Sequence, residues 1–139
     1  MYKEFACQFA FARFLPYWVG GEFVNVGVII YCPATGFLNF KLETTELQRI
    51  INFFPELAIA FYLEGVSAWN DDLERIHQSA NNSNDASGYF AEAVKPKAAA
   101  FRFGPVGSVL TDDPQQELER LFKRYVLRQS ALEVTPIVP

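Results

Sequence analysis

The sequence predicts a single α+β domain, and three observations lead to that prediction. The first 43 residues hold apolar segments whose side chains alternate, as in β-strands, whereas most later segments repeat apolar residues at helical spacing. The 139 residues are 50% hydrophobic and 16% aromatic, which is enough to close one core. This composition excludes an intrinsically disordered chain and a coiled coil. We expect residues 1–130 to form the domain and residues 131–139 to be a frayed tail.

Three antiparallel strands are predicted near the N-terminus. Residues 3–15 alternate between bulky and small side chains, so one face of that strand is mostly Phe and the other mostly Ala. Residues 16–22 contain Pro and paired Gly, which are typical of a loop. Residues 23–32 are apolar and β-branched, which indicates a central strand, and residues 37–43 continue the sheet.

The connection between the second and third strands sets the register of their hairpin. We expect a three-residue loop over residues 34–36, with its Gly in the left-handed conformation. This loop pairs Val28 with Leu42 and gives the hairpin one continuous apolar face. A four-residue loop would instead place the apolar strand opposite Asn39 and Lys41, and we reject it for that reason.

The middle of the chain changes to helical spacing. Residues 44–54 predict a first helix, with Thr45 and Gln48 as a capping box. A second helix is expected from Pro55 to about residue 79, because its apolar residues form one long stripe. Residues 88–95 predict a further short helix.

The C-terminal part adds one strand and one helix. Residues 98–104 predict a fourth strand, with Arg102 on the face opposite its apolar neighbours. Asp113 caps the last helix, and Pro114 occupies its first turn. We expect an antiparallel sheet packed on one face by about three helices. In this arrangement the second and last helices meet a single row of strand residues, namely Val26, Val28, Ile30, Phe40 and Leu42.

Charge and cysteine content narrow the classes of function. The net charge is −4, and all of it lies in residues 41–80, so the chain is not typical of nucleic-acid-binding proteins. Cys7 and Cys32 lie in apolar strands without the spacing of a metal site, and we expect them to be buried free thiols. Charged residues interrupt the N-terminal segment, so we expect neither a signal peptide nor a membrane span and predict a cytoplasmic protein.

Arg13 is the most informative polar residue, because it shares a strand face with phenylalanines. A charge in such a place is costly unless it is paired. Glu22 and Asn25 lie across the first hairpin and are within reach of it. One interpretation is a structural ion pair that locks the hairpin. The other is a small polar binding site, since Arg captures carboxylate or phosphate with two parallel hydrogen bonds.

The loop before the second strand holds two large aromatic residues, Tyr17 and Trp18, beside flexible glycines. Trp18 either folds back over the sheet or forms an exposed tip that contacts another protein, since aromatic residues often anchor interfaces. Asp112 is a further candidate for a binding or general-base role. Its simpler interpretation is that it belongs, with Asp113, to the start of the last helix.

No set of residues in the sequence indicates catalysis, a metal or a cofactor. His77 is the single histidine, so neither a Ser-His-Asp nor a Cys-His pair can be assembled with supporting spacing. A carboxylate–histidine metal site would need a second histidine, and a solvated helix face is the simpler interpretation. The last helix carries a basic stripe that is either solvated or contacts an acidic partner or RNA, made of Arg120, Lys123, Arg124 and Arg128.

Several segments together resemble a bacterial family of unassigned function, the domain of unknown function 3037. They are Ala12–Pro16, Gly21–Val28, Cys32–Pro33 with Gly36–Leu38, and the C-terminal Leu110–Pro114 followed by Leu118–Phe122. The resemblance covers nearly the whole chain, and the run from Glu22 to Val28 is its most specific part. Such proteins are often encoded beside a kinase of the bacterial persistence-toxin type, which implies a partner or accessory role associated with toxin–antitoxin systems.

These observations favour a non-catalytic protein-interaction or accessory module over an enzyme. The protein partner that the resemblance suggests is a kinase-like protein, and we expect no cofactor. The alternative is a small-ligand-binding or enzymatic domain that uses Arg13, Glu22 and Asn25. RNA contact through the basic stripe of the last helix is a weaker third hypothesis.

Overall fold

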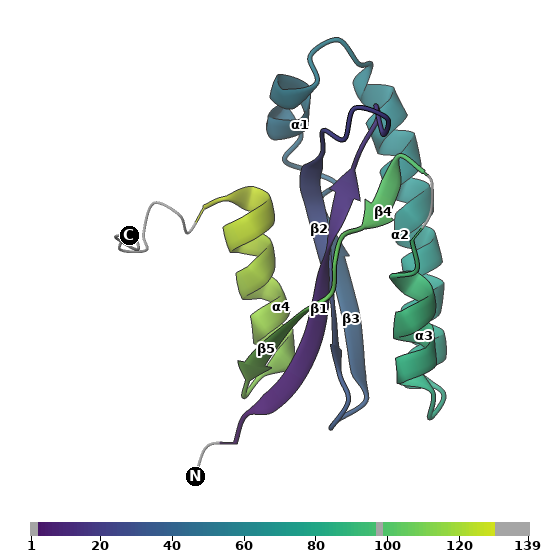
Figure 1. Ribbon diagram of the computed structural model, residues 1–139, viewed down its shortest axis with the longest axis vertical. Coiled ribbons are helices and arrows are strands. Elements are labelled where there is room, and N and C mark those ends of the chain that lie inside the picture. Colours follow the sequence, from purple (N-terminus) through teal and green to yellow (C-terminus); the bar gives the residue numbers. More distant parts are fainter. Residues whose placement is uncertain (1–2, 97–98, 130–139) are drawn as a thin grey trace.

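The computed structural model describes residues 3–96 and 99–129, which form an antiparallel sheet with helices around it (Figure 1). The strand order is β3-β2-β1-β4, and β5 also pairs with β1. The strands are β1 (Phe5–Phe14), β2 (Val24–Cys32), β3 (Phe37–Leu42), β4 (Phe101–Phe103) and β5 (Gly107–Thr111). The helices are α1 (Gln48–Phe53), α2 (Ile59–Asn81), α3 (Ala86–Ala93) and α4 (Pro114–Phe122), which continues as the π-helical segment η1 (Lys123–Leu127).

The predicted α+β class is confirmed, and so are the three N-terminal strands and a later strand at β4. β1 is the central strand, because it pairs with β2 along one edge and with β4 and β5 along the other. Its two faces differ as predicted. Ala10 and Ala12 belong to one core cluster, whereas Phe9 and Phe11 pack against the other.

A β-bulge in β2 changes which side chains share a face. The strand holds one extra residue, Val26, between the residues that pair with Ala12 and Arg13. Val26 therefore lies in the first core cluster, whereas Val28 and Ile30 lie in the second, on the opposite face of the sheet. The prediction of one continuous apolar face is wrong, because side-chain alternation does not continue through a bulge.

The hairpin between β2 and β3 uses the four-residue loop that the sequence argument rejected. Val28 pairs with Lys41, and Ile29 pairs with Phe40. The predicted three-residue loop depended on the assumption that helices cover only one face of the sheet. Both faces are covered, so apolar pairs such as Ile29–Phe40 serve one face while Lys41 faces α4 on the other and pairs with Glu119. Gly36 has the predicted left-handed conformation, with φ of 71°.

The first face of the sheet is covered by α2 and α3, and α1, which lies at one end of the sheet, adds Ile50 to the same core cluster (Figure 1). The predicted stripe of α2 is confirmed, with Tyr62, Val66 and Leu73 buried. Trp69 of the same helix packs on Phe103 of β4, with ring centroids 5.0 Å apart. These contacts attach the short strand β4 to the core.

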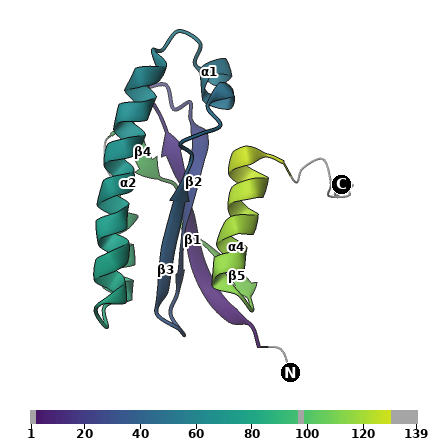
Figure 2. The ribbon, with the colours of Figure 1, turned by 180° about the vertical axis from the view of Figure 1, so that it is seen from behind.

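The second face is covered by α4 and η1, as both views of the ribbon show (Figure 2). Leu118, Leu121, Phe122 and Val126 are buried there against β1 and β2. The expectation that the helices share one face is therefore wrong. Each helix has its own apolar stripe, and a sheet with two apolar faces needs a cover on both.

Several element ends differ from the prediction. Thr45 and Gln48 form no capping box. Instead, the Glu43 carboxylate accepts hydrogen bonds from the backbone N–H groups of Thr45 and Glu46, and α1 begins at Gln48. α2 begins at Ile59, so the prediction of a start at Pro55 is wrong, whereas α3 and α4 begin within two residues of their predicted positions. Strand β5 was not predicted. The predicted tail, residues 131–139, lies outside the described residues.

Candidate functional site

Arg13 lies near the end of β1, on the sheet face that α4 covers farther along the strand. Its guanidinium stacks on the ring of Phe23, with Cζ 3.9 Å from the ring centroid. Gly104 lies directly against it, since a Cβ atom at that position would be 2.6 Å from Arg13 Cζ. A residue with a side chain at position 104 would therefore displace the guanidinium.

The structure brings together only part of the predicted set around Arg13. Asn25 is the register partner of Arg13 on β2, so the two residues lie side by side. Glu22 is exposed, and among the described residues no ion pair joins it to Arg13. The partner of Arg13 on the other neighbouring strand is a second arginine, Arg102 of β4.

The two arginines line a groove at the β4 edge of the sheet. The groove has a volume of about 440 Å³, and its other lining residues are Val94, Pro96, Phe103, Gly104, Pro105 and Val106. Burial, and then the charge of Arg102, lower the pKa of Arg13. The Nε atom of Arg13 is buried and has no hydrogen-bond partner within the described part of the chain. An orphaned buried donor of this kind is uncommon in folded proteins.

The second candidate region is the end of the molecule where the β1–β2 loop lies beside α1 and the start of α2 (Figure 1). Trp18 is 55% exposed and Val19 82% exposed, so Trp18 is not folded away against the sheet. Phe53 of α1 and Phe61 of α2 are also about half exposed. We call Trp18, Val19, Phe53 and Phe61, together with the neighbouring Tyr17, the apolar end.

Aromatic contacts and hydrogen bonds hold the apolar end in shape. The Tyr17 ring packs on Phe54, and its hydroxyl donates a hydrogen bond of 2.8 Å to Glu56 Oε2, which raises the pKa of Tyr17. The buried ring of Phe14 contacts both Phe54 and Phe61. The loop closes with Gly20 N–H donating to Tyr17 O, and Gly21 takes a left-handed φ of 79°.

Asp112 is exposed at the start of α4, far from Arg13. The preceding residue pairs with Phe5, eight residues before Arg13, and that corresponds to roughly 26 Å along a strand. Asp113 caps the helix as predicted, because its side chain accepts from Gln116 N–H at 3.1 Å.

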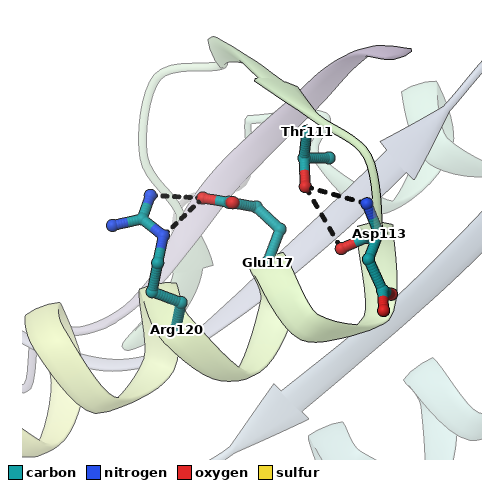
Figure 3. Close-up of polar contacts among 4 residues, drawn as sticks. All are labelled: Thr111, Asp113, Glu117 and Arg120. Carbon is teal, nitrogen blue, oxygen red and sulfur yellow. Dashed lines mark hydrogen bonds and ion pairs between the residues drawn. The ribbon is translucent and has the colours of Figure 1, made fainter. Parts of the chain in front are cut away.

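Two further contacts support the same turn (Figure 3). Thr111 Oγ1 accepts from Asp113 N–H at 3.1 Å and donates to Asp113 O at 3.2 Å. Glu117 is buried, and its carboxylate accepts from the guanidinium of Arg120, one turn farther along α4. These contacts join β5 to α4 and support the first turns of that helix.

Two of the four cations in the basic stripe predicted on the last helix have partners on the same helix. Arg120 pairs with Glu117, and Arg124 lies over the ring of Tyr125 at 5.5 Å. Lys123 and Arg128 are exposed, and Arg128 has a left-handed φ of 64°. The stripe therefore does not present four uncommitted cations along one face.

His77 joins α2 to β3. Its Nδ1 atom lies 2.6 Å from Leu38 O, and Asn81 contacts the other ring nitrogen. Over residues 3–96 and 99–129, no three His, Cys, Asp or Glu side chains are grouped closely enough to hold a metal ion. Cys7 and Cys32 are buried free thiols, as predicted.

Sequence reasoning missed one buried polar cluster, formed by Glu43, Arg49 and Tyr62. Glu43 is only 3% exposed. Its backbone O accepts from the Tyr62 hydroxyl at 2.6 Å, and its carboxylate holds the turn before α1. Arg49 donates to the backbone O of Asn25. The only signal in the sequence was a Glu at the end of an apolar strand, which periodicity alone does not distinguish from a solvated residue.

The described structure defines a small α+β protein with a central antiparallel sheet, helices on both faces, an apolar end and an arginine-lined groove. The chain belongs to the family described as Protein of unknown function (DUF3037), whose model matches residues 9–126. This confirms the resemblance found in the sequence. No curated protein and no solved structure matches the chain. Within the described residues, no helix has both the length and the apolar character needed to cross a membrane.

Proposed function

We propose that this chain is a non-catalytic protein-interaction or accessory module that docks a partner protein through the apolar end. The observation that carries the proposal is the exposure of Trp18, Val19, Phe53 and Phe61 around one buried aromatic pair, Phe14 and Phe54. Exposed apolar side chains are normal when they are scattered, whereas a contiguous group of them marks an interaction site.

The form of the apolar end suits an anchor for a partner. Trp and Tyr are enriched among the residues that dominate binding energies, and they work best on a rigid support. Tyr17 supplies that support, because it is fixed between Phe54 and Glu56. Trp18 follows it directly and is left projecting from the turn. Little conformational entropy is therefore lost when a partner covers this loop.

Charge near the apolar end supports a proposal about the chemistry of the partner. Glu56 accepts a hydrogen bond from Tyr17 at this end, and Glu22 and Glu64 are exposed close in sequence to residues of the apolar end. No Lys or Arg occurs between Arg49 and Arg75. We therefore infer a partner surface with an apolar pocket and a basic rim. A kinase of the persistence-toxin type is the first partner to test, because the family resemblance suggests it.

The test is capture of partners from a lysate of the source cells, identification by mass spectrometry, and titration of the purified partner by calorimetry. Trp18→Ala should weaken binding at least about thirtyfold, the loss expected for an interface anchor worth about 2 kcal/mol. Leu110→Ala is the matched control, because Leu110 is 64% exposed on β5 near the opposite end of the molecule. Equal binding by Trp18→Ala and wild type would refute the proposed surface.

The salt dependence of the association rate tests the inferred basic rim independently. Added salt should slow association, because it screens the electrostatic attraction between the exposed carboxylates and the basic partner. Glu64→Gln should reduce the association rate and its salt dependence without changing the fold, since Glu64 is exposed on α2. An association rate independent of salt would contradict the inferred charge of the partner.

A further inference from the structure

The groove at the β4 edge places two positive charges side by side. Arg13 and Arg102 are direct register partners on neighbouring strands, and like charges in such positions destabilise a sheet. The second arginine also contributes to the lowered pKa of Arg13, after burial. We propose that this groove binds a small molecule that carries an oxyanion, either a carboxylate or a phosphate, between the two guanidinium groups.

Arg13 is held in place before any ligand arrives. The ring of Phe23 covers one side of the guanidinium, and the backbone at Gly104 lies against it. Fixing a long side chain normally costs rotamer freedom at the moment of binding, and here that cost is met by folding. A planar guanidinium fixed in this way offers its N–H groups in the fork that matches two oxygens of a carboxylate or phosphate.

The Nε donor of Arg13 leaves the hydrogen-bonding capacity of the guanidinium partly unused. Arg13 Nε is buried, and no carbonyl or carboxylate of the described residues accepts from it. An unmade hydrogen bond of a buried charged group is expensive, so the guanidinium is poorly solvated. A ligand oxygen that binds its remaining N–H groups from the groove therefore gains more than it would at an exposed arginine. The same oxygen reduces the repulsion between the two arginines.

The walls of the groove indicate the rest of the ligand. Val94, Pro96, Phe103, Pro105 and Val106 supply apolar surface beside the two cations. The volume of about 440 Å³ lies within the usual range for small-molecule sites. The ligand is therefore a small organic anion whose carbon skeleton contacts these side chains, and inorganic phosphate and succinate are its simplest probes.

The experiment measures thermal unfolding of the full chain with increasing phosphate or succinate, against chloride at equal ionic strength. We expect one of the two probes to raise the unfolding temperature in a saturable way. Arg102→Gln should weaken that response about tenfold or more, the loss of one charge-assisted hydrogen bond.

Arg75→Gln is the matched control, since it makes the same change of charge on an exposed face of α2. It should respond to the probe as wild type does. No response beyond that of chloride with either probe, or an equal response in Arg102→Gln, would overturn the proposal. The response to phosphate or to succinate identifies which oxyanion the groove prefers.

A second pair of variants tests the geometry without altering charge. Gly104→Ala places a Cβ 2.6 Å from Arg13 Cζ, so the guanidinium must move, and the variant should abolish the response even if the protein remains folded. Gly20→Ala is its control, because the nearest atom to the added Cβ is 3.6 Å away. The groove lies outside the apolar end, so this proposal can fail while the proposed function stands, and the reverse also holds.

Discussion

Gly27 lies next to the bulge, where β2 and β3 approach each other more closely than a side chain allows. In the variant Gly27→Ala, the new Cβ would be 2.5 Å from the backbone O of Lys41 and equally close to the Leu42 side chain. The carbonyl must retreat by about 0.9 Å to reach the 3.4 Å of ordinary van der Waals contact. Backbone in a paired strand cannot move that far without weakening the pairing.

The size of the effect follows from three contributions. Overpacking of a filled core costs about 1–3 kcal/mol. A weakened hydrogen bond between the strands destabilises the variant by a further 1 kcal/mol, roughly. The lower conformational entropy of the unfolded Ala variant offsets about 0.4–1 kcal/mol of this loss. Together these contributions predict that Gly27→Ala lowers the free energy of unfolding by about 1–3.5 kcal/mol, with a central value of roughly 2 kcal/mol.

Urea denaturation followed by circular dichroism measures this quantity, with Gly20→Ala as the control. Gly20 meets no close atom, so that variant should stay within about 0.5 kcal/mol of wild type. A Gly27→Ala protein as stable as the control would refute the close approach of β3 to the bulge, and with it the reason for a Gly at this position.

Three further predictions concern the second face of the sheet. Leu118→Ala should lower the free energy of unfolding by about 3–5 kcal/mol, because Leu118 lies on the buried side of α4 and is 1% exposed; a loss below about 1 kcal/mol in urea denaturation would contradict the packing of that helix. Glu119→Gln should cost less than about 1 kcal/mol, since its ion pair with Lys41 is partly exposed, and a cost unchanged in 1 M salt would show that the pair is not the cause. Burial, followed by a hydrogen bond with Cys32, raises the pKa of Cys7 from 9.0 to about 12. The unfolded thiol therefore ionises first, and stability should fall as the pH rises from 9 toward 12, by up to about 1.4 kcal/mol per pH unit; an equal slope in Cys7→Ala would exclude Cys7 as its source.

The parts of the fold that depend on local patterns were predictable. The stripe of α2, the Asp113 cap and the alternation of β1 each follow from side chains within one segment. The bulge at Val26 was not predictable, because it depends on how β2 meets β1 and leaves no mark on the alternation of apolar residues. The error in the β2–β3 register came from assuming that only one face of the sheet is covered.

The candidate sites were predictable to a similar degree. Arg13 and Trp18 stood out because each contrasts with its neighbours in the sequence. Arg102 was placed on the polar face of its strand, but its position beside Arg13 depends on the pairing of β4 with β1, which joins residues far apart in the chain. Strand β5 was missed because it is only five residues long and begins with Gly and Ser, so its apolar alternation is too short to indicate a strand.

The most direct test of the proposed function compares partner capture by wild type, Trp18→Ala and Leu110→Ala at equal amounts of folded protein. The proposed function predicts one protein recovered in stoichiometric amount with wild type and Leu110→Ala, and its loss with Trp18→Ala. Recovery of no stoichiometric protein by wild type, or of the same amount with Trp18→Ala, would contradict docking through the apolar end.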